Sequence, residues 1–148
     1  MRKRCKALIL IFIAILLVIG YKKYFFTFDS LNQGTYFKGP VDSPNGKYRA
    51  DSYFENWGGA TGGANVWVEI TNNENSEVRT IYYSDGKSNY NMEWTDDNII
   101  YITNDEGPEY PDSDNSIELE IGKEIFDERG RACDSWLMKD EYETCSQN

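Results

Sequence analysis

The feature that most constrains this chain is an uncharged apolar run near its N-terminus, ALILIFIAILLVIGY over residues 7–21. Basic residues flank the run on both sides: Arg2, Lys3, Arg4 and Lys6 before it, and Lys22 and Lys23 after it. A run this apolar is expected to leave water, and a basic N-terminal flank favours keeping that end in the cytoplasm during insertion. The pattern predicts a signal anchor over residues 1–23, crossing the cell membrane once, with the rest of the chain outside the cytoplasm.

The apolar run is short for a membrane crossing. A fifteen-residue helix covers about 22 Å, whereas the hydrocarbon core of a bilayer is about 30 Å thick. Lysines at both ends can extend its reach by placing their ammonium groups at the two interfaces. Four aromatic residues would then lie in the headgroup layer: Tyr24, Phe25, Phe26 and Phe28. The alternative is a signal peptide cleaved near Gly20, which would release a secreted protein.

Charge is divided sharply at Lys23. Residues 24–148 contain nine basic and all 25 acidic residues, which gives this part a net charge of −16. Its 125 residues suit a single domain. The negative electrostatic field of residues 24–148 repels nucleic acid and attracts cations or basic partners, so we expect no nucleic-acid partner. An acidic surface also keeps an exported domain soluble, which requires no partner at all.

The chain contains no histidine. Without imidazole there is no Ser-His-Asp or Cys-His nucleophile, and no ordinary zinc site of nitrogen and sulfur ligands. Any bound metal would be a hard ion held by oxygen atoms, which means calcium or magnesium. We therefore expect no enzymatic activity and no cofactor, with calcium as the candidate ion.

The cysteines divide between the two sides of the predicted anchor. Cys5 lies on the cytoplasmic side, which leaves Cys133 and Cys145 as an even pair in an oxidising compartment. We expect them to form a disulfide, and two free thiols are the alternative. Closing a loop of about a dozen residues stabilises the fold by roughly 3 kcal/mol, largely by restricting the unfolded chain.

Alternating polar and apolar residues predict a mainly β domain over residues 43–148. Residues 24–42 contain Gly39 and Pro40 and no helical period, and we interpret them as a juxtamembrane tether. Ser43-Pro44-Asn45-Gly46 predicts a turn. Strands are expected at 47–55, 65–71, 78–83, 89–94, 99–103 and 116–121, with a weaker one at 124–127.

Strands that recur about every ten residues and are joined by polar turns favour an antiparallel meander, either a small sandwich or a partly open barrel. Near the C-terminus, Asp134 or Ser135 could cap a short helix that continues to Tyr142. The Cys133–Cys145 pair would hold that helix in place.

Several motifs in this order resemble a family of small, uncharacterised membrane-anchored proteins of Bacillus-like bacteria. They are SPNGKY at 43–48, GGAT at 58–61, IYY at 81–83 and EWTDD at 93–97. The resemblance covers roughly residues 40–121 and, in addition, the N-terminal anchor. It implies a compartment and a fold, and it carries no catalytic residue.

An acidic stretch supplies the candidate calcium ligands. Calcium takes six to eight oxygen ligands, and a loop rich in carboxylates can provide them. The candidates are Asp105, Glu106, Glu109, Asp112 and Asp114. The spacing departs from the EF-hand pattern, and clustered carboxylates in a Pro-containing loop are usually just solvated.

Two fragments match signatures of penicillin-binding enzymes. Residues 84–87 read Ser-Asp-Gly-Lys, which fits S-x-x-K, and residues 113–115 read S-D-N. That chemistry needs Ser and Lys one helical turn apart, whereas Asp85-Gly86 predicts a turn between strands. The third signature, K-T-G, is missing from the sequence.

These observations favour a non-enzymatic envelope protein. Its β-domain would bind an envelope protein or a cell-wall component through an exposed sheet edge or an aromatic face. The alternative is a carboxylate-based cation-binding domain or a small envelope enzyme.

Overall fold

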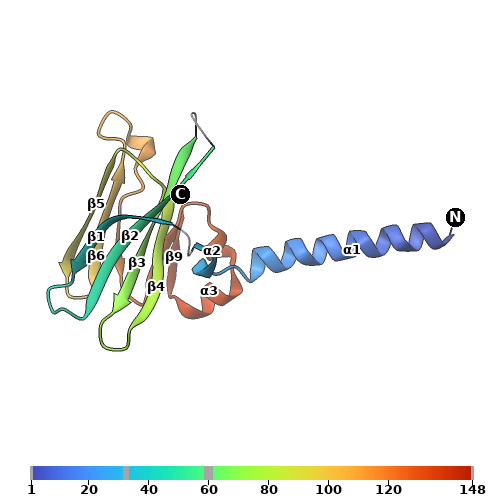
Figure 1. Cartoon of the computed structure of the whole chain (residues 1–148), viewed down its shortest axis with the longest axis horizontal. Coiled ribbons are helices and arrows are strands. Elements are labelled where there is room, and N and C mark those ends of the chain that lie inside the picture. Colours follow the sequence, from blue (N-terminus) through green and yellow to red (C-terminus); the bar gives the residue numbers. More distant parts are fainter. Residues whose placement is uncertain (1, 32–33, 59–61, 148) are drawn as a thin grey trace.

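The computed structural model describes residues 2–31, 34–58 and 62–147, with only the backbone for residues 2–7, 29 and 30. It consists of a long N-terminal helix and a β-domain (Figure 1). The elements in chain order are α1 (Arg2–Tyr24), the 3₁₀ turn η1 (Phe28–Leu31), β1 (Thr35–Asp42), β2 (Tyr48–Trp57), β3 (Gly63–Asn72), β4 (Glu77–Asp85), β5 (Asn89–Asp96), β6 (Ile99–Asp105), η3 (Pro111–Ser113), β7 (Ile117–Glu120), β8 (Glu124–Asp127), α2 (Arg131–Asp134), α3 (Trp136–Glu141) and β9 (Thr144–Ser146).

The strands form two sheets, one in the order β1-β2-β3-β4-β8-β9 and the other in the order β5-β6-β7. A mainly β fold with a small sandwich is therefore confirmed, but the purely antiparallel meander is wrong. Strand β8 pairs with β4 in parallel, and β9 pairs with β8 in parallel. Periodicity indicates that a segment is a strand but does not indicate its partner, and β8 reaches β4 only after the chain has built the whole second sheet.

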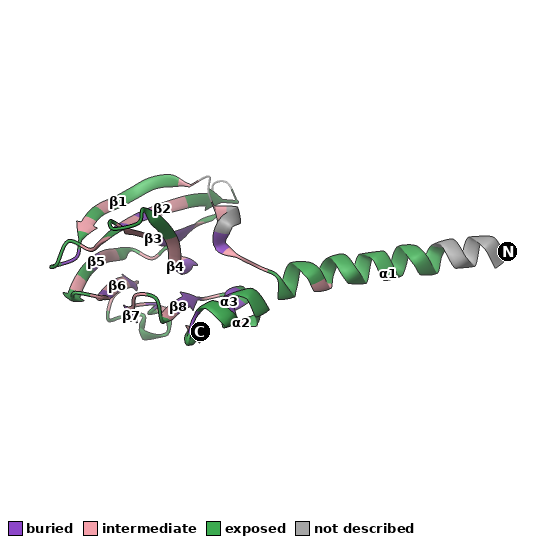
Figure 2. Ribbon diagram, turned by 90° about the horizontal axis from the view of Figure 1, so that it is seen from below, coloured by how far each residue is buried: buried purple, intermediate pink, exposed green. Residues whose placement is uncertain are grey.

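The core lies between the two sheets, where alternate side chains of each strand meet. Val68 and Ile70 on β3 face this layer, as do Ile100 and Ile102 on β6. A third layer, made by η1, α2 and α3, covers the other face of the larger sheet (Figures 1 and 2). Trp67 is 1% exposed on that face. The larger sheet is therefore buried on both sides at its centre.

The predicted tether at residues 24–42 is wrong for most of its length. Residues 35–42 form β1, which pairs antiparallel with β2. Phe28, expected in a headgroup layer, is 6% exposed and packs in the β-domain core. Gly39 and Pro40 interrupt the alternation that marks a strand, and two register shifts accompany them. An edge strand tolerates such residues because one of its sides needs no ladder hydrogen bonds.

Strand β1 also closes one corner of the sandwich against β5. The Lys38 ammonium donates to the Asn91 side-chain oxygen at 2.7 Å, and the Trp94 indole N–H donates to the Val41 carbonyl at 3.0 Å. These bonds cover part of the free edge of the larger sheet, and an edge covered in this way is protected from pairing with other chains.

The C-terminal segment follows the prediction closely. Cys133 and Cys145 are joined by a disulfide with a Cα–Cα distance of 5.2 Å. The predicted helix is α3, and Ser135 caps it by accepting a hydrogen bond from the Met138 N–H. The short helix α2 precedes it and was not predicted. Ser135 is buried, which adds to the anchoring of this segment.

Helix α1 projects away from the β-domain (Figures 1 and 2). Its large apolar side chains from Leu8 to Ile19 are 45–68% exposed. Within the ranges that the structure describes, no helix combines the length and the apolar character that a membrane crossing requires. This finding does not support the transmembrane helix predicted over residues 7–21.

Candidate binding pocket

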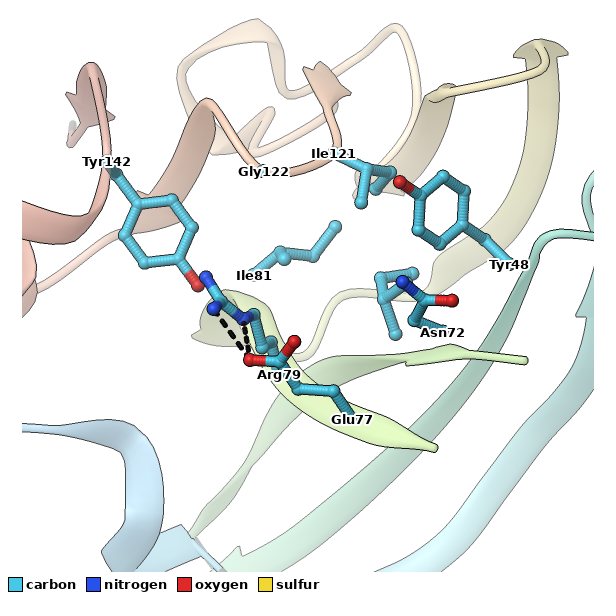
Figure 3. A pocket seen from close by; sticks show the side chains of 9 residues that line it. Tyr48, Asn72, Glu77, Arg79, Ile81, Ile121, Gly122 and Tyr142 are labelled. Carbon is cyan, nitrogen blue, oxygen red and sulfur yellow. Dashed lines mark hydrogen bonds and ion pairs between the residues drawn. The ribbon is translucent and has the colours of Figure 1, made fainter. Parts of the chain in front are cut away.

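An open pocket of about 130 Å³ lies at one end of the sandwich (Figure 3). Two tyrosines stand on opposite sides of it, Tyr48 from the start of β2 and Tyr142 from the segment after α3. The remaining lining residues are Ile70, Asn72, Glu77, Arg79, Ile81, Ile121 and Gly122. The pocket thus combines an isoleucine floor with a polar rim, a pattern typical of ligand sites.

Arg79 is the central polar group of the pocket. Its guanidinium contacts the Glu77 carboxylate on the same strand at 2.6 Å and the Glu141 carboxylate of α3 at 2.8 Å. It also hydrogen-bonds to the Tyr142 side chain. Since β4 alternates its side chains, Glu77 and Arg79 lie on the same face of the strand and meet directly.

A second hollow of about 280 Å³ adjoins the first and shares Glu77, Arg79 and Tyr142 with it. It lies towards α3 and includes Phe28 and Met138 in its lining. Arg79 therefore stands between the two hollows. A change at this side chain would alter the shape of both.

The ion pair sets the electrostatics of the rim. Hydrogen bonding to Arg79 lowers the pKa of Glu77, and the same bond raises the pKa of Arg79. Burial raises the pKa of the Tyr142 hydroxyl, so this phenol stays protonated at neutral pH. With two carboxylates already bound to it, Arg79 is not free to bind an anion. The rim suits a neutral hydrogen-bonding group or a cation above an apolar floor.

A sealed polar network explains the fragments that match penicillin-binding signatures. Ser84 is fully buried, and its hydroxyl accepts a hydrogen bond from the Asn115 side chain at 2.8 Å. Asn104 donates to the Tyr82 hydroxyl at 2.8 Å and accepts from the Lys87 backbone N–H at 2.8 Å. The structure brings Ser84 and Asn115 together, but no substrate reaches a hydroxyl that is buried in this way. The network joins β4 of one sheet to β6 of the other.

The structure does not gather the predicted calcium ligands into one group. Asp105 and Asp114 face each other across an isolated β-bridge. Asp105 accepts from the Gly107 N–H and from Asn89, while Asp114 accepts from the Ser116 N–H. Hydrogen bonds from the Ser116 side chain and then from its backbone lower the pKa of Asp114. Glu106 accepts from Ser88, and Glu109 and Asp112 are exposed. In the part of the chain that the structure describes, no three acidic or cysteine side chains are placed to hold a metal ion.

The family comparison applies to most of this architecture. The profile of one family, described as a family of unknown function, DUF5412, matches residues 2–130. The chain belongs to this family. No curated protein and no solved structure gives a significant match. The expected resemblance to a family of unknown function is thereby confirmed, while its membrane-anchored character and bacterial source stay predictions.

The boundary of the family match divides the pocket. Arg79, Glu77 and Tyr48 lie inside the DUF5412 match, whereas Glu141 and Tyr142 lie beyond it. The C-terminal extension therefore completes one wall of the pocket and adds the disulfide. Of the GGAT motif used for the resemblance, residues 59–61 lie outside the described residues.

Sequence reasoning did not predict this pocket. Its lining comes from three strands, the turn after β7 and the segment after α3, so no local pattern marks it. One signal was available: Arg79 and Ile81 alternate along the predicted strand at 78–83, and Glu77 stands one residue before it, so a strand longer by one residue would put an ion pair and an apolar residue on one face.

Proposed function

We propose that this chain is a non-catalytic binding domain held at the outer face of a cell membrane by α1. The observation that carries the proposal is the exposure of every large apolar side chain described between Leu8 and Ile19. Each such side chain gains about 1.5–3 kcal/mol when it is fully removed from water. A helix that is apolar all round is favoured in a lipid environment or inside a larger protein core.

The ends of α1 support membrane attachment and its direction. Lys22 and Lys23 end the apolar run, and the rings of Tyr21 and Phe25 stack at a centroid distance of 5.1 Å. Lysine and aromatic side chains of this kind are enriched at membrane–water interfaces. The basic flank before residue 7 favours a cytoplasmic N-terminus, which places the β-domain outside.

The β-domain supports binding rather than catalysis. Its accessible polar pocket holds Arg79 between two carboxylates, and Ser84, the serine of the S-x-x-K match, is sealed in the core. A basic side chain of an envelope protein or a hydroxyl-rich wall component fits the chemistry of this rim. The net charge of −16 over residues 24–148 favours the basic partner.

Cell fractionation tests the membrane part of the proposal. Full-length chain expressed in a bacterium with a single membrane should stay in the membrane pellet after alkaline carbonate extraction. External protease should degrade the β-domain in intact protoplasts. An Ile13→Lys, Leu16→Lys variant should move to the soluble fraction with its β-domain folded. A wild-type chain extracted by carbonate would contradict the anchor, and an intact mass beginning after Gly20 would show the cleaved, secreted alternative.

Site-specific photocrosslinking in cells tests the binding part. A photoreactive residue at Asn72, on the rim of the pocket, should give a discrete crosslinked product. The matched control places the same residue at Tyr110, which is 60% exposed between β6 and β7. A product at position 72 and none at 110 supports the pocket as the binding site. Equal products at both positions, or none at 72, would contradict it.

A further inference from the structure

Helix α3 leaves two large apolar side chains exposed beside the end of α1. Trp136 is 56% exposed and Leu137 is 46% exposed, although the next residue, Met138, is buried against the β-domain. Figures 1 and 2 show the domain from two directions, and in both α2 and α3 lie at the side from which α1 leaves. The exposed side chains of α3 therefore belong to the face of the domain closest to α1.

Direct contacts hold α1 and α3 together. The Tyr24 ring stacks on the Trp136 ring at a centroid distance of 5.1 Å, and the Phe25 ring meets Trp136 edge-on at 5.6 Å. We call Tyr24, Phe25, Trp136 and Leu137 the interface collar. An ion pair of 3.1 Å joins Lys23 to Asp134, and the Ser135 hydroxyl donates to the Phe26 carbonyl at 2.7 Å. The collar is thus one surface built from two distant parts of the chain.

We infer that the interface collar docks the β-domain directly on the lipid surface, with Trp136 and Leu137 in the headgroup layer. This inference rests on the proposed membrane attachment of α1. Lys22 and Lys23 mark the level at which the apolar run ends, and Tyr24 is the next residue. A ring that stacks on Tyr24 must lie within a few ångströms of that level. An indole is favoured there because the interface is apolar on one side and wet on the other.

The charges around the collar are compatible with a zwitterionic lipid surface. Lys23 neutralises Asp134, and the Arg131 guanidinium lies over the Phe26 ring at 5.2 Å. Asp140 is exposed one helical turn after Trp136, and the domain as a whole is acidic. The docking therefore depends on the apolar and aromatic side chains and does not require anionic lipid. It also orients the candidate pocket, because Tyr142 follows α3 directly.

Quenching of tryptophan fluorescence by brominated lipid tests the docking in the full-length chain. The protein is reconstituted in phosphatidylcholine vesicles with or without bromine atoms at carbons 6 and 7 of the acyl chain. Trp136 is one of four tryptophans, so its quenching should remove up to about one quarter of the emission. In the Trp136→Phe variant most of this quenching should disappear. The matched control is Trp94→Phe, since Trp94 of β5 bonds to Val41 of β1 and both strands lie on the side of the domain away from α1 (Figure 1). This variant should lose the same absolute emission as the wild-type chain, which is up to about one third of its own total.

Vesicle flotation separates failure of this inference from failure of the anchor. If wild-type and Trp136→Phe chains float equally and are quenched equally, the docking is wrong while membrane attachment by α1 stands. If the wild-type chain does not float with the vesicles, the proposed attachment fails and the docking fails with it. Circular dichroism of both variants confirms that the β-domain is folded, which is expected because Trp136 is largely exposed.

Discussion

Helix α1 and strand β3 are both rich in apolar residues, yet they present them in opposite ways. In β3, Val66, Val68 and Ile70 are at most 3% exposed, and the intervening positions face the other side of the sheet. In α1, apolar residues surround the whole helix and remain exposed from Leu8 to Ile19. One face of a strand can be buried by one sheet, whereas a helix that is apolar all round needs an apolar environment on every side. The β-domain completes its own core, and α1 requires something outside the domain.

The largest difference between the two regions should appear in truncations of matched side chains. Ile102→Ala removes a fully buried side chain from β6 and should lower the free energy of unfolding by about 2–5 kcal/mol. Leu16→Ala in α1 should change it by less than about 0.5 kcal/mol, because Leu16 is 52% exposed. Urea unfolding of the full-length chain in mild detergent measures both. Equal losses would mean that α1 is part of the cooperative core.

The disulfide provides the next largest effect, since it ties the collar-bearing segment to the β-domain. Replacing Cys133 and Cys145 by Ser should cost roughly 3 kcal/mol, because the unfolded chain gains the freedom of the opened loop. The change should lower the midpoint of urea unfolding. Wild-type protein treated with reductant should show the same shift, and a stability unaffected by both treatments would contradict the role assigned to the bond.

A somewhat smaller loss is expected from the buried network between the sheets. Asn104→Ala removes the acceptor of the Lys87 backbone N–H and the donor to the Tyr82 hydroxyl, which keeps its own bond to the Asn115 carbonyl. Leaving the Lys87 N–H unpaired costs about 1–3 kcal/mol. Asn91→Ala, which loses only an exposed bond to Lys38, is the control. If the two variants are equally stable by urea unfolding, the network does not join the sheets as described.

The smallest effect concerns the ion pair of the pocket and depends on pH. Arg79 lowers the pKa of Glu77 below its ordinary value of 4.5 in the folded state. A depressed carboxyl pKa adds stability above the unfolded pKa, and this stability is lost as pH falls through the folded value. The urea midpoint of the wild-type chain should therefore fall below about pH 4.5 more steeply than that of Arg79→Met. Identical pH profiles would show that the pair is fully screened by solvent.

The strands could be predicted from the sequence wherever one face is buried and the other solvated, as in the segment that became β6. Strand β1 escaped prediction because Gly39 and Pro40 break its alternation, and β9 is too short to show a period. Strand β8 was expected at 124–127, but its parallel pairing with β4 was not. The Cys133–Cys145 bond was predicted by counting the cysteines on the side of the chain expected to be exported. Pairing preferences over long distances are set by the packing of the whole domain, which a local pattern does not contain.

The candidate pocket was the least predictable part of the molecule. The acidic loop at 105–114 drew attention as a cluster in sequence, but its best-placed carboxylates bond to neighbouring turns. Arg79 was not a candidate from the sequence, because its partner Glu141 lies 62 positions away. The two side chains meet only when α3 packs against the sheet. Side chains that are close in sequence therefore need not be close in the fold, and a site built from several elements leaves no cluster in the sequence.

Hydrogen exchange of α1 in lipid vesicles tests most directly whether a membrane provides the apolar surroundings that the β-domain does not give this helix. We expect the backbone amides of residues 8–19 to be strongly protected in the vesicle-bound chain, because a helix in hydrocarbon has no water to replace its internal hydrogen bonds. The same amides should exchange rapidly in the Ile13→Lys, Leu16→Lys variant, while β3 stays protected in both. Rapid exchange of residues 8–19 in the vesicle-bound wild-type chain would contradict the insertion of α1 into the membrane.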